Sequence, residues 1–145
     1  MFNTALHIID VAGGAQRQIT PWVIGAGNPS WSPDGKHIAF NSWGGHSPNL
    51  YVVDPDGTHL KLLLRANTTA SHIGWVDAPA WSPDGKQIAF GTQTNPCHSF
   101  RVNGCPRDPD FEPFDLYAIG ADGTHLRRLT SARQFESRPA WGPAR

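Results

Sequence analysis

The sequence repeats one short phrase three times, and this repetition constrains the fold more than any other feature. The copies of the phrase are PSWSPDGKHIAF at 29–40, PAWSPDGKQIAF at 79–90 and a truncated PAWGPAR at 139–145. A second phrase accompanies it: LYVVDPDGTHLKLLL at 50–64, LYAIGADGTHLRRLT at 116–130 and a degenerate LHIIDVAGGAQRQIT at 6–20. Internal repetition at this period predicts an array of similar structural units.

The spacing of the copies defines the length of the unit. Leu6 and Leu50 are 44 residues apart, whereas the repeated tryptophans Trp31, Trp81 and Trp141 are separated by 50 and then 60 residues. Insertions of 6 and 16 residues in the connections explain the two longer spacings, so the underlying unit has 44 residues. Because these three tryptophans occupy one repeat position, we expect all of them to belong to the core.

Each unit reads as four short antiparallel strands. PSW or PAW forms strand one, and the turn SPDG follows, in which proline presets φ and glycine accepts a positive φ. Strand two is KHIAF or KQIAF, strand three is LYVVD or LYAIG, and a second turn leads to strand four. Strands two and three are continuously apolar, which indicates burial on both faces of the sheet. Such a sheet, repeated every 40–45 residues, is typical of a propeller blade.

The sequence therefore predicts an all-β chain that forms part of a β-propeller, as one domain over 1–145. It contains two full four-stranded blades and a split terminal blade: a blade remnant at 6–20, blades at 29–64 and 79–130, and a lone first strand at 139–141. Propellers have about 4–8 blades. Three explanations are open: a piece of a longer chain, a homo-oligomer that completes the propeller head to tail, or an open stack capped by its own termini.

The motif WSPDGKxIAF followed by LYVVDPDGTHLKLL resembles the TolB-type propeller repeat, a relative of the WD repeat. The resemblance covers most of the chain apart from the two insertions, and it implies a β-propeller. Resemblance to TolB itself implies binding of a lipoprotein partner in the periplasm. Similar repeats occur in prolyl oligopeptidase-like enzymes, whose propeller gates a separate hydrolase domain, and some polysaccharide lyases use a propeller with a histidine-bound metal.

Because neighbouring strands alternate in direction, the connections from strand two to three and from strand four to the next blade lie at one end of each blade. Both insertions, 67–78 and 92–115, belong to these connections. Aromatic and histidine side chains gather there and form the predicted binding rim: Trp22, Trp43, His46, His72, Trp75 and Phe100. Such a rim suits a protein or peptide partner, or a sugar. The alternative is that the tryptophans pack beneath their own loops.

Catalytic motifs are missing from the sequence. There is no GxSxG, HExxH, CxxC or phosphate-binding glycine loop. Ser32 and Ser82 lie within the SPDG turns, where a hydroxyl bonds local backbone, and His59 and His125 share one repeat position. We therefore expect a non-catalytic interaction module without metal or cofactor. The alternatives are a carbohydrate-binding or accessory fragment of a propeller-containing hydrolase or lyase, and an architectural fragment without a ligand.

The charge balance and the cysteine content limit the classes of partner and the cellular compartments that we expect for this chain. Twelve basic residues balance twelve acidic ones, so we expect no nucleic-acid binding, and no apolar run approaches the ~20 residues of a membrane span. Cys97 and Cys105 can close a small disulfide loop, with two free thiols as the alternative. As written, the start is no secretory signal. This favours a cytoplasmic protein, or a periplasmic or extracellular one if the start is truncated.

Overall fold

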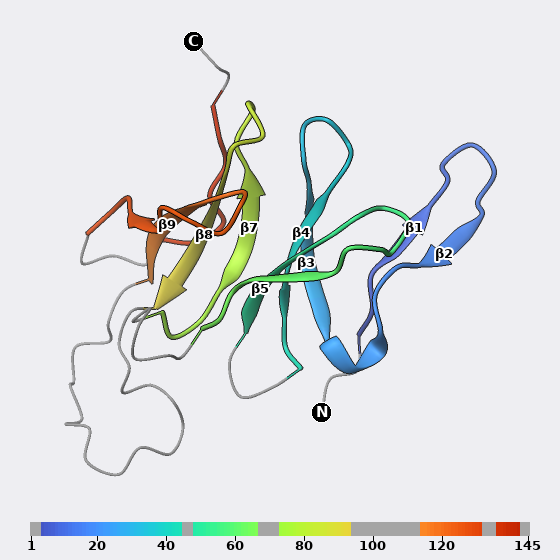
Figure 1. Cartoon of the computed structure of the whole chain (residues 1–145), viewed down its shortest axis with the longest axis horizontal. Coiled ribbons are helices and arrows are strands. Elements are labelled where there is room, and N and C mark those ends of the chain that lie inside the picture. Colours follow the sequence, from blue (N-terminus) through green and yellow to red (C-terminus); the bar gives the residue numbers. More distant parts are fainter. Residues whose placement is uncertain (1–3, 45–47, 67–72, 94–113, 132–135, 143–145) are drawn as a thin grey trace.

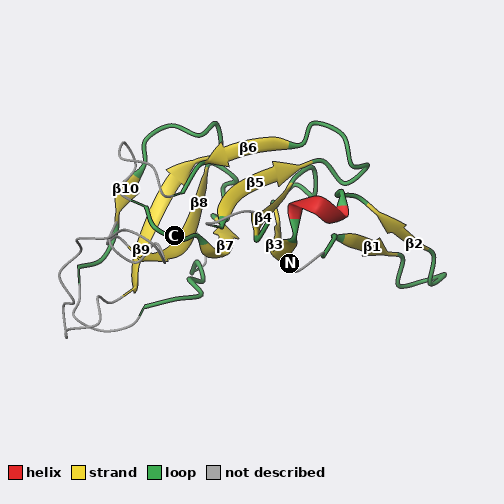
Figure 2. Ribbon diagram, turned by 90° about the horizontal axis from the view of Figure 1, so that it is seen from below, coloured by secondary structure: helices red, strands yellow, loops and turns green. Residues whose placement is uncertain are grey.

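The computed structural model describes residues 4–44, 48–66, 73–93, 114–131 and 136–142. Within these residues the secondary structure is β-strand apart from one short 3-10 turn, and no helix is long and apolar enough to span a membrane. The strands form three antiparallel sheets that lie side by side in chain order (Figure 1). Seen from below, the sheets follow an open arc (Figure 2). The predicted all-β class and four-stranded antiparallel blades are confirmed.

The first sheet is a two-stranded ribbon, and the other two sheets are four-stranded blades. The ribbon consists of β1 (His7–Ile9) and β2 (Gln16–Gln18), and η1 (Trp22–Ile24) connects it to blade one. Blade one contains β3 (Ala26–Trp31), β4 (Ile38–Ser42), β5 (Asn49–Val53) and β6 (Lys61–Leu64). Blade two contains β7 (Asp77–Trp81), β8 (Gln87–Gln93), β9 (Phe114–Gly120) and β10 (Arg127–Arg128).

The SPDG turns are closed by their own side chains. In blade one, Ser32 Oγ donates to Asp34 Oδ1 at 2.7 Å and accepts the backbone N–H of His37 at 2.9 Å. Blade two repeats the arrangement, with Ser82 Oγ donating to Asp84 Oδ1 at 2.6 Å. The glycine that follows each aspartate has a positive φ, near 69° in both turns. The predicted local bonding of both serines is therefore confirmed.

Replacing Ser82 with alanine should lower the free energy of unfolding by about 1–3 kcal/mol, because the backbone N–H of Gln87 loses its hydrogen-bond acceptor. The Ser82 side chain is buried, and its hydroxyl accepts the N–H of Gln87 at 3.0 Å. Urea unfolding followed by tryptophan fluorescence measures the effect. Ser131→Ala, at an exposed position, is the matched control. If Ser82→Ala unfolds at the same urea concentration as the control, the hydroxyl of Ser82 does not stabilise the turn, which would contradict the role assigned to it.

Apolar side chains hold the three sheets together. β7 of blade two lies against β3 and β4 of blade one. The buried cluster between the two blades includes Ala39, Leu50, Leu63, Trp81, Ile88, Phe90 and Ile119. A second cluster joins the ribbon to blade one and contains Leu6, Ile19, Ala26, Ile38, Phe40 and Val53. All five residues of β4 are buried, so the predicted burial of strand two on both faces is confirmed there.

The prediction that every repeat tryptophan is a core residue is wrong for Trp31. Trp81 is 8% exposed, whereas Trp31 is 49% exposed. The His37 ring of blade one stacks on Trp81 of blade two, with ring centroids 6.3 Å apart and an interplanar angle of 21°. His37 lies at the start of the second strand of its blade. The ribbon has only two strands, equivalent to strands three and four, so in the described structure it offers Trp31 no such cover.

The third repeat tryptophan occupies an intermediate position. Pro139–Trp141, predicted as a lone first strand, form no strand in the structure. Trp141 is half-buried, and its indole N–H donates to the carbonyl oxygen of Ala80 in β7 at 2.9 Å. Trp141 therefore lies against blade two, as Trp81 lies against blade one.

Candidate functional site

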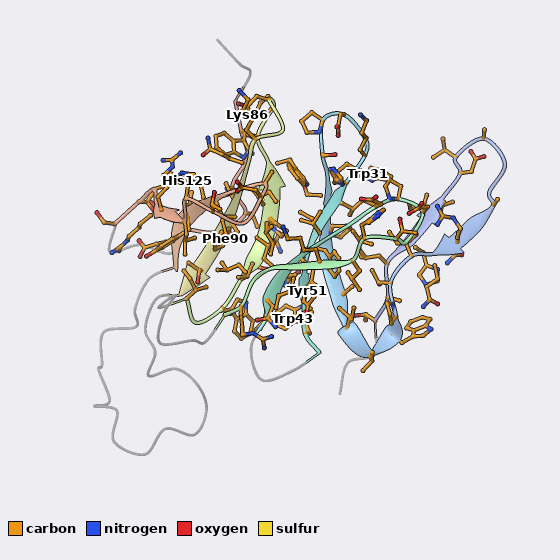
Figure 3. All side chains as sticks on the ribbon, viewed as in Figure 1. Trp31, Trp43, Tyr51, Lys86, Phe90 and His125 are labelled. Atoms are coloured by element: carbon orange, nitrogen blue, oxygen red, sulfur yellow. The ribbon has the colours of Figure 1, made fainter. Side chains whose placement is uncertain are left out.

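Two of the predicted rim tryptophans lie in contact at one end of the blades. Trp43 follows β4, and Trp75 precedes β7. Their ring centroids are 4.9 Å apart at an interplanar angle of 78°, the edge-to-face arrangement that aromatic pairs favour. Both side chains are half-buried. Figure 3 shows Trp43 at the end of the blades opposite Lys86, which belongs to an SPDG turn. We call the end with Trp43 the loop rim and the opposite end the turn rim.

The connection from the ribbon to blade one lies at the same loop rim. The backbone N–H of Trp43 donates to the carbonyl of Gly25 at 2.7 Å, and the N–H of Gly44 donates to that of Ile24 at 2.8 Å. These bonds attach the residues after β4 to the end of η1. Three connections that are distant in sequence are thus held together, as the alternation of strand direction predicts.

A buried amide lies beneath the tryptophan pair. Asn41 faces Gly27 across the β3–β4 ladder and is fully buried, and neither its amide nitrogen nor its oxygen has a hydrogen-bond partner. A Cβ on Gly27 would lie 3.6 Å from Asn41 Oδ1 and 3.2 Å from Trp43 Nε1, so both groups approach this glycine. Leaving a buried polar group unpaired costs about 1–3 kcal/mol. The amide is enclosed, so it belongs to the interior of the blade and not to the exposed rim.

The structure does not gather all the predicted rim residues. Trp22 lies in η1, is 52% exposed, and contacts His7, with ring centroids 5.7 Å apart. It makes no ring contact with the Trp43–Trp75 pair among those found in the described residues. The remaining predicted positions lie outside the described residues: His46, His72 and Phe100 of the rim, and Cys97 and Cys105 of the proposed disulfide.

The turn rim carries a groove that the sequence did not predict. It has a volume of about 670 Å³ and lies between the SPDG turns of the two blades. Its apolar lining includes Val52, Leu63 and Trp81. The polar residues along it are Ser32, Asp34, His37, Asp54, His59, Lys61 and Asp84.

One carboxylate in this groove binds two histidines. Asp54 Oδ1 lies 2.8 Å from His37 Nδ1, and Asp54 Oδ2 lies 2.9 Å from His59 Nδ1. The hydrogen bonds from His59 and then His37 lower the pKa of Asp54 below its ordinary value. Hydrogen bonds within their own turns likewise lower the pKa values of Asp34, Asp56, Asp84 and Asp122.

Acid should weaken the fold through Asp54. Because its pKa is lower in the folded chain than the ordinary 3.8, the ionised carboxylate stabilises the fold above that pH, and this contribution is lost as pH falls through the folded pKa. At pH 7 we expect Asp54→Asn to have a lower urea midpoint than the parent chain. The difference between the two should shrink below about pH 4. A difference that stays constant from pH 7 to pH 3 would contradict this linkage.

The residues of this cluster differ between the two blades, and that difference could have revealed the cluster from the sequence. Blade two carries His125 at the position of His59, but Gln87 replaces His37 and Gly120 replaces Asp54. The cluster is therefore specific to blade one, and the sequence singled out only the histidine that both copies share. Within the described residues, no group of three or more His, Cys, Asp or Glu side chains could hold a metal ion. The groove offers hydrogen-bonding groups beside an aromatic wall.

Comparison with known proteins agrees with this architecture. No family model matches the sequence. A curated relative, the Tol-Pal system protein TolB of Syntrophus aciditrophicus, is 43% identical over 37 residues, which are 26% of this chain and 8% of that protein. A TolB structure from Agrobacterium tumefaciens superimposes with a TM-score of 0.67 at 23% identity, covering 87% of this chain and 40% of the other. The chain has the fold of part of a β-propeller, and it is similar to the propellers of TolB proteins.

Two further solved structures extend the comparison. TolB from Acinetobacter baumannii gives a TM-score of 0.60 at 23% identity, with 87% of this chain and 26% of the other covered. The acylaminoacyl peptidase of Pyrococcus horikoshii gives a TM-score of 0.56 at 18% identity, covering 85% of this chain and 20% of that enzyme. The chain thus spans well under half the length of these proteins. At these identities the likeness establishes the propeller fold.

Proposed function

We propose that this TolB-like propeller module is non-catalytic and binds a protein or peptide partner at its loop rim. The observation that carries the proposal is the edge-to-face pair of Trp43 and Trp75, whose ring centroids are 4.9 Å apart. Trp43 lies between β4 and β5, and Trp75 lies on the connection from blade one to blade two. Tryptophan is enriched among the residues that dominate binding energy, because it combines a large apolar surface with an N–H donor.

The surface chemistry of the two rims favours the loop rim over the turn-rim groove as the binding site. In the groove, the carboxylates of Asp34, Asp54 and Asp84 already accept hydrogen bonds from neighbouring side chains. At the loop rim, the rings of Trp43 and Trp75 are only half-buried. A partner can cover their remaining apolar surface there without breaking existing hydrogen bonds.

The hydrogen bonds of Ser32 and Ser82 support the proposal that the module is non-catalytic. Each hydroxyl donates to a turn aspartate and accepts a backbone N–H, so it is engaged in closing its turn. A serine nucleophile instead needs a histidine base within hydrogen-bond reach of its hydroxyl. Ser32 and Ser82 therefore serve the scaffold.

Selection from a random peptide library displayed on phage, with the full chain immobilised, tests the proposal. Dissociation constants of the selected peptides are then measured for the parent chain, Trp75→Ala and Lys86→Ala. We expect Trp75→Ala to weaken binding at least ~10-fold, and we expect Lys86→Ala, at an exposed position of the turn rim, to leave it unchanged. Thermal melting of each variant shows whether it is folded.

Two outcomes would overturn this function. Selected peptides that bind folded Trp75→Ala as well as the parent chain would exclude the tryptophan pair as the site. An oligosaccharide array probed in parallel tests the other partner class. Binding of oligosaccharides that depends on Trp75, with no peptide selected, would replace the peptide partner with a carbohydrate.

A further inference from the structure

The chain contains one repeat interface that is complete and one that is open. At the complete interface, blade one covers Trp81, whose ring is stacked on His37 and whose backbone N–H donates to Ser30 Oγ at 3.4 Å. At the open interface, Trp31 occupies the same repeat position but remains 49% exposed against the ribbon. The difference lies in the covering sheet, because the ribbon lacks strands one and two of a blade.

The backbone along one side of β1 is also unpaired in the described structure. The carbonyl of Leu6 accepts the N–H of Ile19, and the N–H of Asp10 donates to the carbonyl of Ala15, both at 2.9 Å, so these residues point toward β2. Backbone groups alternate between the two sides of a strand. Those of His7 and Ile9 therefore point away from β2, along an edge that β1 shares with no strand among the described residues.

Apolar surface accompanies this edge. A depression of about 150 Å³ beside β1 is lined by residues that include Ile8, Ile9, Trp31 and Ile38. Ile9 is 59% exposed and Trp31 is 49% exposed. An edge with unpaired N–H and C=O groups beside exposed apolar side chains is a template for pairing with another strand.

We propose that the free edge of β1 binds an extended segment of a partner polypeptide, which adds to the ribbon as its missing second strand. The two complete blades show what fits. In blade one, Ile38 lies opposite Val53 and Phe40 opposite Tyr51, and blade two pairs Ile88 with Ile119 and Phe90 with Tyr117. The segment therefore has the pattern Ile-Ala-Phe and runs antiparallel to β1.

The repeat also sets the register of this segment. Ile9 and His7 occupy the positions of Val53 and Tyr51. The isoleucine of the partner therefore lies opposite Ile9, and its phenylalanine lies opposite His7. The residue before the isoleucine takes the place of His37 and stacks on Trp31.

A partner chain fits this role better than a second copy of the protein. β4 and β8 are the strands of this pattern within the described structure, and each is paired on both sides in its own blade. A second copy would have to open a blade to donate one of them. This surface includes Trp31, at the turn rim, and is separate from the Trp43–Trp75 pair, so the two proposals stand or fall independently.

A synthetic peptide tests the proposal. A fluorescein-labelled peptide Asp-Gly-Lys-His-Ile-Ala-Phe-Asn, with the sequence of residues 34–41, is titrated with the full chain and followed by anisotropy. N-methylation of the phenylalanine amide should weaken binding at least ~10-fold, because that N–H faces β1. N-methylation of the alanine amide, which faces away, should leave binding unchanged. Trp31→Ala should weaken binding at least several-fold, and Trp75→Ala should have no effect.

Three results would overturn the inference. Failure of the unmodified peptide to bind would exclude the edge as a strand acceptor. Equal weakening by both N-methyl groups would show binding without the predicted register. Light scattering supplies the third result: an oligomer of the chain that dissociates in saturating peptide would assign the edge to a second copy.

Discussion

Replacing Trp81 with alanine is expected to lower the free energy of unfolding by about 3–5 kcal/mol, the usual cost of truncating a large buried aromatic side chain. Trp81 is 8% exposed and belongs to the apolar cluster that joins the two blades. Its indole N–H has no hydrogen-bond partner, so the loss arises from packing. Because blade two lies on blade one through β7, the truncation removes contacts from both blades at once.

Trp31→Ala is the matched control for this substitution, since it removes the same side chain from the same repeat position. With Trp31 half-exposed, we expect a change within about 1 kcal/mol. Urea unfolding of both variants, followed by circular dichroism, measures the difference. Equal midpoints for the two variants would show that the two tryptophans contribute equally and would contradict the assignment of the interblade core.

Gly44→Ala should also destabilise the chain strongly, by about 3 kcal/mol, the upper part of the range for overpacked sites. A Cβ at this position would lie 2.3 Å from the carbonyl oxygen of Val23 and 2.5 Å from that of Ile24. Both obstacles are backbone atoms of η1, which cannot rotate away as a side chain does. The substitution therefore forces the residues after β4 apart from η1 and disturbs the loop rim.

Gly142→Ala provides the control, because a Cβ there would meet no heavy atom within 4 Å. We expect that variant to unfold at the same urea concentration as the parent chain. Near-ultraviolet circular dichroism reports on the Trp43–Trp75 contact and should change in Gly44→Ala alone. Wild-type stability and an unaltered aromatic spectrum in Gly44→Ala would contradict the close approach of the two connections.

Local chemistry made the blades predictable. The SPDG turn specifies its own closure, because serine, aspartate and glycine interact within six residues, as the bonds around Ser32 and Ser82 show. The continuous apolar character of strand two predicted burial on both faces, and β4 has it along its whole length. Strand order follows from these local pairings, since each strand pairs with its neighbours along the chain.

The sequence predicted the residues of the two rims less well than it predicted the blades. The sequence placed Trp22, Trp43 and Trp75 at one end, but only the last two form a pair, because η1 directs Trp22 toward His7. The bond between Asp54 and its two histidines was missed because its members are spread over three turns and strands that approach one another only after blade one has formed.

What the sequence by itself determined is the repeating unit: its strands, its turns and the propeller blade that they build. These features depend on short-range pairing and on the pattern of apolar residues. Only the tertiary structure decided how exposed each copy is. Trp31 and Trp81 occupy the same repeat position in nearly identical sequences, yet one is half-exposed and the other buried. Burial depends on what the preceding sheet contains, and that is a property of neighbouring units in space.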